Sequence, residues 1–226
     1  MMDRNEAVAR ESSPVPATSP TDLASFVCAT DKETKATVHI RDYTAEHEAD
    51  IPATVWEAAL ATSAAVTFFD ACALGNRVFL DGGTGANNPV REVEEEATII
   101  WTEDKGQLER LVKCFISIGT GHPGIDAVKD SVYGFLTKTL VQLATDTEKV
   151  AKQFVGTWAG HFEKKRYYRF NVEQGMQGME LHEYKKIGTM EATTELYLNH
   201  AERKQRVRDC TQNLALKESV YLYDFA

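Results

Sequence analysis

The segment from Phe79 to Pro89, with the sequence FLDGGTGANNP, constrains the fold more than any other part of the chain. Its apolar start predicts the end of a strand, and Asp81 follows at the beginning of a turn. Gly82, Gly83 and Gly85 lie in that turn, and glycine tolerates positive φ and the close approach of another group. The pattern therefore predicts a carboxylate at a strand end with open space beside it.

The same segment also predicts the start of a helix. Asn88 is a candidate N-cap, and Pro89 suits the first helical position. A strand, a carboxylate, a glycine turn and a capped helix are a typical way for an α/β enzyme to carry a catalytic acid. The alternative is that Asp81 only caps the turn, because turns favour Asp and Gly for local reasons.

The periodicity of apolar residues elsewhere predicts strands that alternate with helices. The predicted strands are 24–29, 36–40, 77–80, 111–118 and 167–172, with a polar turn at 31–34 joining the first two. The predicted helices are 52–63, one that carries Val90, Val93, Ala97 and Ile100 on one face, 126–156, 191–199 and 205–216. This order favours an α/β fold with a layered, mostly parallel sheet.

Two further segments, Trp56–Asp70 and Phe115–Gly121, flank the aspartate motif. Together with Asp81-Gly82-Gly83 and Ala86–Pro89 they resemble the patatin-like phospholipase family, especially its fungal members. The resemblance runs from about Phe26 to about Leu216. It implies that residues 23–226 form the C-terminal portion of a patatin-like domain, incomplete at its N-terminal side. The polar composition of residues 1–22, rich in Ser, Pro and Ala, predicts a disordered lead-in.

The resemblance also implies a catalytic Ser–Asp dyad, in which Asp81 is the proton acceptor and Gly82 and Gly83 complete its motif. The family's nucleophile lies in a Gly-x-Ser-x-Gly elbow, a tight turn that bulkier neighbours would block. No serine in the sequence has this pattern: Ser63, Ser117 and Ser131 each lack one or both glycines. No nucleophile is found, and the chain is expected to be inactive alone.

Three hypotheses follow. The chain is a portion of a lipid acyl hydrolase of the phospholipase A or acylglycerol esterase type, a non-catalytic binding or regulatory module, or an enzyme in which Ser63 or Ser117 works with Asp81. The resemblance implies a lipid or phospholipid acyl ester as partner, with contact to a peripheral membrane surface.

Composition excludes several other functions. The 25 basic and 34 acidic residues give a net charge of −9, which argues against nucleic-acid binding. The two basic clusters, 164–169 and 203–208, are interpreted as solvated faces. The six histidines show no paired ligand spacing, so no metal is expected. Four separated cysteines, with Cys28 and Cys114 in apolar runs, favour a reducing cytoplasmic compartment without disulfides.

Two weaker patterns have structural explanations. Residues 119–124 formally match Gly-x-Gly-x-x-Gly, but Pro123 lacks a backbone N–H for a phosphate, so no cofactor is predicted. Five large side chains could line an acyl groove but are better explained as core: Phe162, Tyr167, Tyr168, Met176 and Met179. Finally, an incomplete sheet would expose an apolar edge or face at 77–80 or 111–118, which predicts poor solubility or an oligomer.

Overall fold

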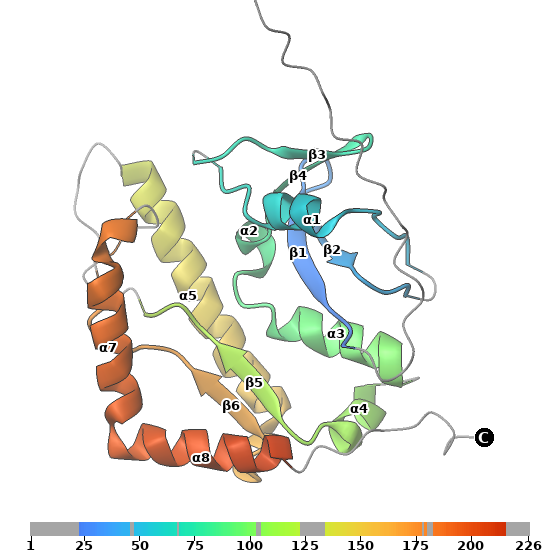
Figure 1. Ribbon diagram of the computed structural model, residues 1–226. Helices are drawn as coiled ribbons and strands as arrows, with labels where there is room; N and C mark the ends of the chain where they lie inside the picture. Colours follow the sequence, from blue (N-terminus) through green and yellow to red (C-terminus); the bar gives the residue numbers. More distant parts are fainter. Residues whose placement is uncertain are drawn as a thin grey trace, which may run out of the picture. The chain divides into compact units, whose positions relative to one another are not determined.

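The computed structural model describes residues 23–45, 48–66, 68–102, 105–122, 134–177, 179 and 183–215, and for 105–107 and 134–145 only the backbone. The predicted lead-in over residues 1–22 lies outside this part of the chain. The structure divides into two compact units, with the boundary between Gly82 and Gly83. Each unit is described separately (Figure 1).

The first unit is built around a four-stranded sheet with the order β2-β1-β4-β3. Strand β1 (Phe26–Asp31) and strand β2 (Thr37–Arg41) form the predicted hairpin, with Phe26 opposite Arg41 and Thr30 opposite Thr37. Strand β4 (Arg77–Asp81) pairs with β1 on one side and with the short strand β3 (Cys72–Leu74) on the other.

All three pairings in this sheet are antiparallel, so the prediction of a mostly parallel sheet is wrong for the sheet that carries Asp81. The physical reason is the connections. Tight turns join β1 to β2 and β3 to β4, and the second turn contains Gly75 at φ +58°. Parallel neighbours would need a long crossover instead. Of the two segments expected to expose an apolar edge or face, 77–80 is not at an edge, because β4 lies between two strands.

Helix α1 (Val55–Thr62) packs against this sheet and corresponds to the helix predicted over 52–63. A capping box begins it: the Thr54 hydroxyl accepts the Glu57 N–H, and the Glu57 carboxylate accepts the Thr54 N–H. The core of this unit is small and consists of Ala29, Ile40, Ala61, Leu74 and Phe79.

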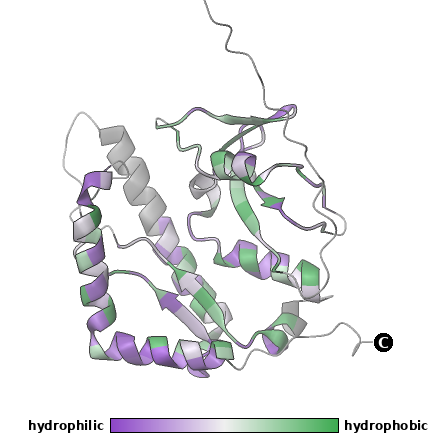
Figure 2. Ribbon diagram, viewed as in Figure 1, coloured by the Kyte–Doolittle hydropathy of each residue, from purple (hydrophilic) through white to green (hydrophobic). Residues whose placement is uncertain are grey.

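The second unit contains the remaining elements of the described chain. In order they are α2 (Gly83–Ala86), α3 (Val90–Trp101), α4 (Lys105–Leu111), β5 (Phe115–Ile118), α5 (Gly134–Thr157), α6 (Ala159–Glu163), β6 (Tyr167–Phe170), the 3-10 helix η1 (Tyr184–Lys186), α7 (Ile187–Asn199) and α8 (Ala201–Ala215). Strands β5 and β6 are parallel, with Phe115 opposite Tyr167 and Ile118 opposite Phe170. Figure 2 shows hydrophobic residues along β5 and a largely hydrophilic α8.

The core of the second unit is aromatic. Phe115, Phe154, Trp158 and Tyr167 lie with ring centroids 5.0–5.8 Å apart, and Val90, Ala97 and Leu108 complete the cluster. The indole N–H of Trp158 donates to the buried Glu94 carboxylate at 3.1 Å. This bond pairs two buried polar groups with each other.

Several predicted boundaries in this unit are corrected. Pro89, not Asn88, is the N-cap of α3, and it provides no side-chain cap. Leu111 is the last residue of α4, and the strand predicted over 111–118 begins only at Phe115. Val93 is 37% exposed, so the predicted buried stripe of α3 is only partly correct. Residues 126–133 of the predicted long helix lie outside the described chain, and α5 covers the rest.

Strand β5 has β6 as its one neighbour among the described strands, and Ile118 at its end is 79% exposed. No helix in the described ranges is both long and apolar enough to cross a membrane.

Candidate functional site

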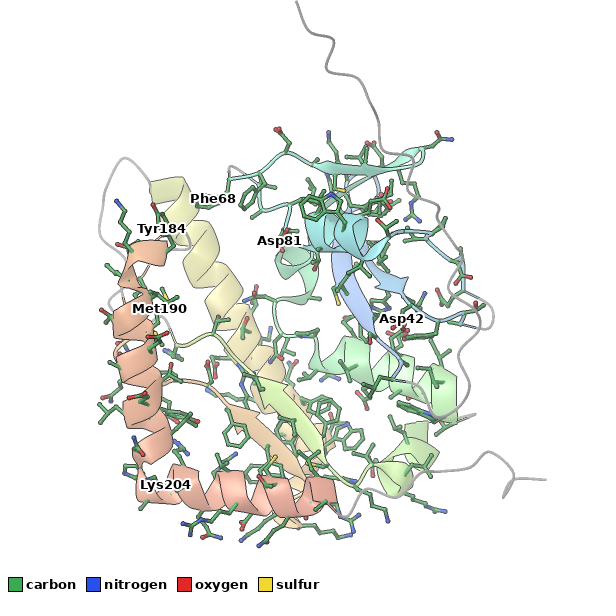
Figure 3. All side chains as sticks on the ribbon, in the orientation of Figure 1. Asp42, Phe68, Asp81, Tyr184, Met190 and Lys204 are labelled. Atoms are coloured by element: carbon green, nitrogen blue, oxygen red, sulfur yellow. The ribbon has the colours of Figure 1, made fainter. Side chains whose placement is uncertain are left out.

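Asp81 lies where β4 ends, as its sequence context predicts (Figure 3). The residue is partly buried. Its backbone N–H donates to the Ala64 carbonyl at 3.0 Å, and its carbonyl accepts the Thr30 hydroxyl at 2.9 Å. The next N–H, that of Gly82, donates to the Thr62 carbonyl at 3.2 Å. Both peptide groups that flank the Asp81 Cα are therefore fixed.

Gly82 is buried, and a Cβ at this position would overlap the backbone carbonyl oxygen of Cys28 on β1. The Thr62 hydroxyl donates to that same oxygen at 2.6 Å. Gly82 is thus needed for a close approach, but the approaching group is the backbone of β1 and not a loop beside the Asp81 carboxylate. The predicted positive φ is wrong here, because the glycines with positive φ in the described chain are Gly75, Gly121 and Gly175.

Gly83 begins α2, directly after the boundary of the first unit. The asparagines that follow contact α5 within the second unit. The side-chain amide of Asn87 donates to the Thr147 hydroxyl at 2.7 Å, and that of Asn88 donates to the Thr147 carbonyl at 3.2 Å. These asparagines connect α3 to α5, which explains why Asn88 does not cap its own helix.

The candidate alternative nucleophiles have other hydrogen-bond partners. The exposed Ser63 donates its hydroxyl to the Ala59 carbonyl at 2.7 Å, one turn earlier in α1. The hydroxyl of Ser117 is buried and accepts an Arg169 N–H at 2.9 Å. Ser131 lies outside the described residues. Neither a backbone carbonyl nor a guanidinium can act as the base that a serine nucleophile needs.

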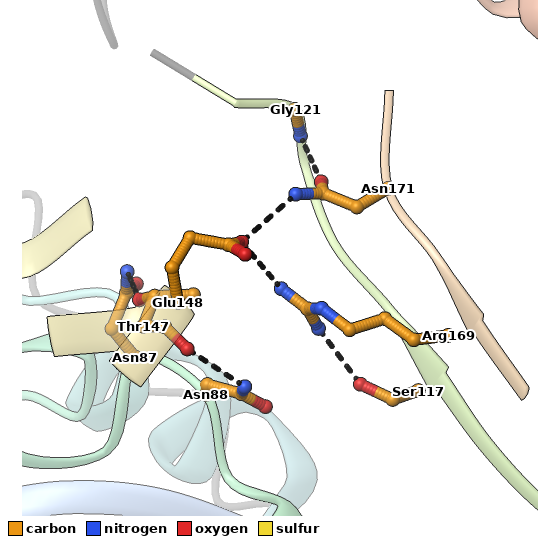
Figure 4. A network of polar contacts seen from close by, with 8 residues as sticks. All are labelled: Asn87, Asn88, Ser117, Gly121, Thr147, Glu148, Arg169 and Asn171. Carbon is orange, nitrogen blue, oxygen red and sulfur yellow. Dashed lines mark hydrogen bonds and ion pairs between the residues drawn. The ribbon is translucent and has the colours of Figure 1, made fainter. Parts of the chain in front are cut away.

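A polar network holds the carboxyl ends of β5 and β6 against α5 (Figure 4). The Arg169 guanidinium contacts Ser117 and lies 3.4 Å from the Glu148 carboxylate, which also accepts the Asn171 amide at 3.3 Å. Asn171 in turn accepts the Gly121 N–H at 2.8 Å. Sequence reasoning missed this network because its members are far apart in the chain.

The network also explains the glycine-rich loop after β5. A Cβ on Gly119 would overlap the Asn171 side-chain oxygen, and Gly121 has φ +114°. The Gly121 N–H is already bonded to Asn171 rather than available to a phosphate. Pro123 and Gly124 lie outside the described residues, and the part that is described supports the interpretation as a tight loop.

Three side chains near the start of these strands have raised pKa values. Burial raises the pKa of the Tyr167 and Tyr168 hydroxyls. Burial, followed by the neighbouring Cys210 thiol, raises the pKa of Cys114 to about 12. A thiol with so high a pKa is a poor nucleophile at neutral pH. Cys114 is only partly buried and lies directly before β5.

In the basic segments 164–169 and 203–208, Lys165, Arg169 and Arg203 each form an ion pair with an acidic side chain. Arg203 lies 2.6 Å from Glu173, and Lys165 lies 3.0 Å from Asp209. The described residues contain no group of three His, Cys, Asp or Glu side chains that could hold a metal ion. Of the candidate acyl-groove residues, Tyr167 and Tyr168 are each 3% exposed, and Tyr167 belongs to the core. Phe162 is 46% exposed, so its assignment to the core is wrong.

An exposed apolar surface lies on α1 and the loop after it. Val55 is 89% exposed and Trp56 is 68% exposed, and Leu60 lies one turn further along the helix at 42%. Val66 and Phe69 extend the exposed apolar residues beyond the end of α1. We call these five residues the α1 surface.

Comparison with known proteins finds similarity to phospholipases. The chain is 33% identical over 120 residues to calcium-independent phospholipase A2-gamma of Rattus norvegicus and 32% identical to that of Homo sapiens; in both, the match covers 52% of this chain and 14% of the relative. It is 30% identical over 131 residues to phospholipase A I of Arabidopsis thaliana, over 57% of this chain and 9% of the relative. No family model matches the chain. The chain spans a small part of the relatives it matches, and their names support the resemblance to patatin-like phospholipases.

Proposed function

We propose that this chain is a portion of a patatin-like lipid acyl hydrolase and that Asp81 is its catalytic proton acceptor. The similarity to phospholipases in mammals and in a plant carries the proposal. The finer assignment, to the C-terminal portion of a fungal-type domain, rests on the motifs Asp81-Gly82-Gly83 and Ala86–Pro89. The substrate class is an acyl ester of a phospholipid or an acylglycerol.

In this mechanism the Asp81 carboxylate accepts the proton of a serine hydroxyl while the serine oxygen attacks the ester carbonyl carbon. The alcohol then leaves with a proton, and water cleaves the acyl-enzyme. Because the 226 residues contain no Gly-x-Ser-x-Gly, the proposal places the nucleophile on a segment outside this sequence. The chain contributes the base and the backbone that fixes it.

The first test is the purified chain itself, which should show no turnover of short-chain nitrophenyl esters or phosphatidylcholine vesicles. The second test joins the full chain behind a patatin-like segment that carries a Gly-x-Ser-x-Gly elbow. This hybrid should hydrolyse the short-chain nitrophenyl esters, and Asp81→Asn should abolish that activity.

Asp70→Asn is the matched control, because Asp70 is an exposed aspartate of the same unit. An active hybrid that tolerates Asp81→Asn would exclude Asp81 as the base. Turnover by the chain alone that is lost in Asp81→Ala and with a serine-directed phosphonate would instead support Ser63 or Ser117 as nucleophile.

The second candidate function is a non-catalytic module that binds a lipid surface, and the α1 surface favours it. Val55, Trp56 and Leu60 expose apolar area, and aromatic residues such as Trp suit the boundary between water and lipid. The chain should then bind phosphatidylcholine vesicles in co-sedimentation, and Trp56→Ala should weaken the binding. Trp101→Ala is the control, since Trp101 is also exposed but lies on α3 in the second unit.

A further inference from the structure

We propose that Thr30 and Thr62 are positioning residues for Asp81, which rests on the proposed role of Asp81 as proton acceptor. Neither threonine is part of the aspartate motif. Thr30 belongs to β1 and lies 51 residues before Asp81, and Thr62 is the last residue of α1.

The peptide group between Asp81 and Gly82 is held on both sides. Its carbonyl accepts the Thr30 hydroxyl at 2.9 Å, and its N–H donates to the Thr62 carbonyl at 3.2 Å. The peptide group before Asp81 is fixed separately, through the Ala64 carbonyl at 3.0 Å. Two fixed peptide planes determine φ and ψ of Asp81, and hence the direction of its Cα–Cβ bond.

Thr62 contributes with its side chain as well as its backbone. Its hydroxyl donates to the Cys28 carbonyl at 2.6 Å, and this bond ties the end of α1 to β1. The Cys28 carbonyl is also the group that a Cβ on Gly82 would overlap. Thr62 therefore holds α1, β1 and β4 in the relative positions at which Gly82 fits.

The donors are well placed to act in this way. Thr30 is 2% exposed, so its hydroxyl has little access to water as an alternative partner. A buried hydroxyl that loses its acceptor costs free energy, which favours one rotamer of Thr30 and one position of the Asp81 carbonyl. A base must lie within hydrogen-bond reach of the proton that it accepts, and such positioning affects the rate of reaction rather than substrate binding.

The first experiment uses the 226-residue chain and does not depend on activity. Thr30→Val and Thr62→Val replace each hydroxyl with a methyl group of similar size. Amide hydrogen exchange at Gly82 should rise about five- to tenfold in each variant, which corresponds to the loss of one ordinary hydrogen bond. Thr30→Ser and Thr62→Ser should restore the exchange to the original rate.

Thr37→Val is the matched control, because Thr37 lies directly opposite Thr30 on β2. It should leave exchange at Gly82 unchanged. The proposal is overturned if Gly82 exchange does not rise in the two valine variants. It is equally overturned if exchange rises by the same factor throughout β1 and β4, since that result would mean general destabilisation.

The second experiment measures kinetics in the active hybrid introduced under the proposed function. Thr30→Val and Thr62→Val should lower kcat about tenfold with KM unchanged, and the serine variants should recover it. Unchanged kcat in a hybrid that needs Asp81 would overturn the positioning role. If Asp81→Asn has no effect in the hybrid, the proposed function fails, while the exchange measurements still decide whether the threonines fix Asp81.

Discussion

The carboxyl end of β4 and the carboxyl ends of β5 and β6 are held by different kinds of interaction. At Asp81 the contacts that fix the backbone are neutral, from the Thr30 hydroxyl and from the carbonyls of Ala64 and Thr62. At the β5–β6 pair a guanidinium and a carboxylate, Arg169 and Glu148, organise the network.

The difference determines what each region responds to. Threonine hydroxyls and backbone groups keep their protonation state over the ordinary pH range, so these backbone contacts of Asp81 should be insensitive to pH and salt. The Arg169–Glu148 pair is partly exposed, at 14% and 30% of the two side chains, and salt screens such pairs. The end of β4 is therefore held by neutral hydrogen bonds and close packing, and the ends of β5 and β6 are held by an ion pair.

A substitution that adds volume at a tightly packed position should have the largest effect on stability. Gly82→Ala places a Cβ against the Cys28 carbonyl, and backbone cannot move aside as a flexible side chain can. We expect a loss of about 3 kcal/mol in the free energy of unfolding, near the upper end for overpacking. Urea denaturation followed by circular dichroism measures it.

Gly156→Ala is the control for this substitution. Gly156 is an exposed residue of α5, and a Cβ added there would have no other atom within 4 Å apart from the helix's own backbone. Alanine at this position should stabilise the helix by about 0.5–1 kcal/mol. Equal effects of the two substitutions would mean that Gly82 is not constrained by β1.

A substitution that removes a charged side chain should have the next largest effect on stability. Arg169→Gln removes the guanidinium that joins Ser117 to Glu148 and leaves a carboxylate with a weaker set of donors. We expect a loss of about 2 kcal/mol, as for a hydrogen bond to a charged group. The loss should shrink in high salt, which urea denaturation at a low and a high NaCl concentration can show.

Lys186→Gln is the matched control in the same unit. Lys186 lies 2.7 Å from Glu183, three residues earlier, and its side chain is 45% exposed. An exposed pair of this kind should contribute under about 0.5 kcal/mol. If the two variants lose the same amount, the Arg169 network is an ordinary surface pair.

A smaller effect is expected at the start of α1, the end remote from Asp81. Thr54→Ala removes the cap that accepts the Glu57 N–H at 3.3 Å. We expect a loss of about 1 kcal/mol in the free energy of unfolding. Exchange at Gly82 should not change, because its partners lie at the other end of the helix. A rise at Gly82 as large as in Thr62→Val would show that α1 moves as one body.

The sequence predicted that Asp81 ends a strand but not which strands lie beside it. The hairpin from Phe26 to Arg41 and the strand that ends at Asp81 were predictable, since alternation and turn residues are local signals. The antiparallel pairing of β4 with β1 was not, because pairing depends on contacts between distant segments. Strand β3 has three residues, too few for a periodic pattern.

The same limit applies to the site. Gly82 suggested a close approach, but nothing nearby in the sequence indicated that the Cys28 carbonyl is the approaching group. Thr30 and Thr62 are ordinary residues for a strand and a helix end, and no local pattern marks them. Asn88 was expected to cap α3, but its contact with Thr147, 59 residues later, replaces that role.

The last prediction concerns the other end of β4, where the first sheet does use charge. One Asp31 oxygen accepts the N–H groups of Glu33 and Thr34, and the other accepts two bonds from Arg77 at 2.8 and 3.0 Å. The Thr34 N–H, followed by Arg77, lowers the pKa of Asp31 from 3.8 to about 2. Because the pKa is lower in the folded state, this contribution to stability is complete above about pH 4 and is lost as the pH falls toward 2. The difference in Tm between the wild type and Asp31→Asn should therefore narrow over that interval, and Arg77→Gln, which removes only the second cause, should retain part of the dependence. A difference in Tm that stays constant from about pH 5 to pH 2 would show that these contacts do not favour the charged form of Asp31.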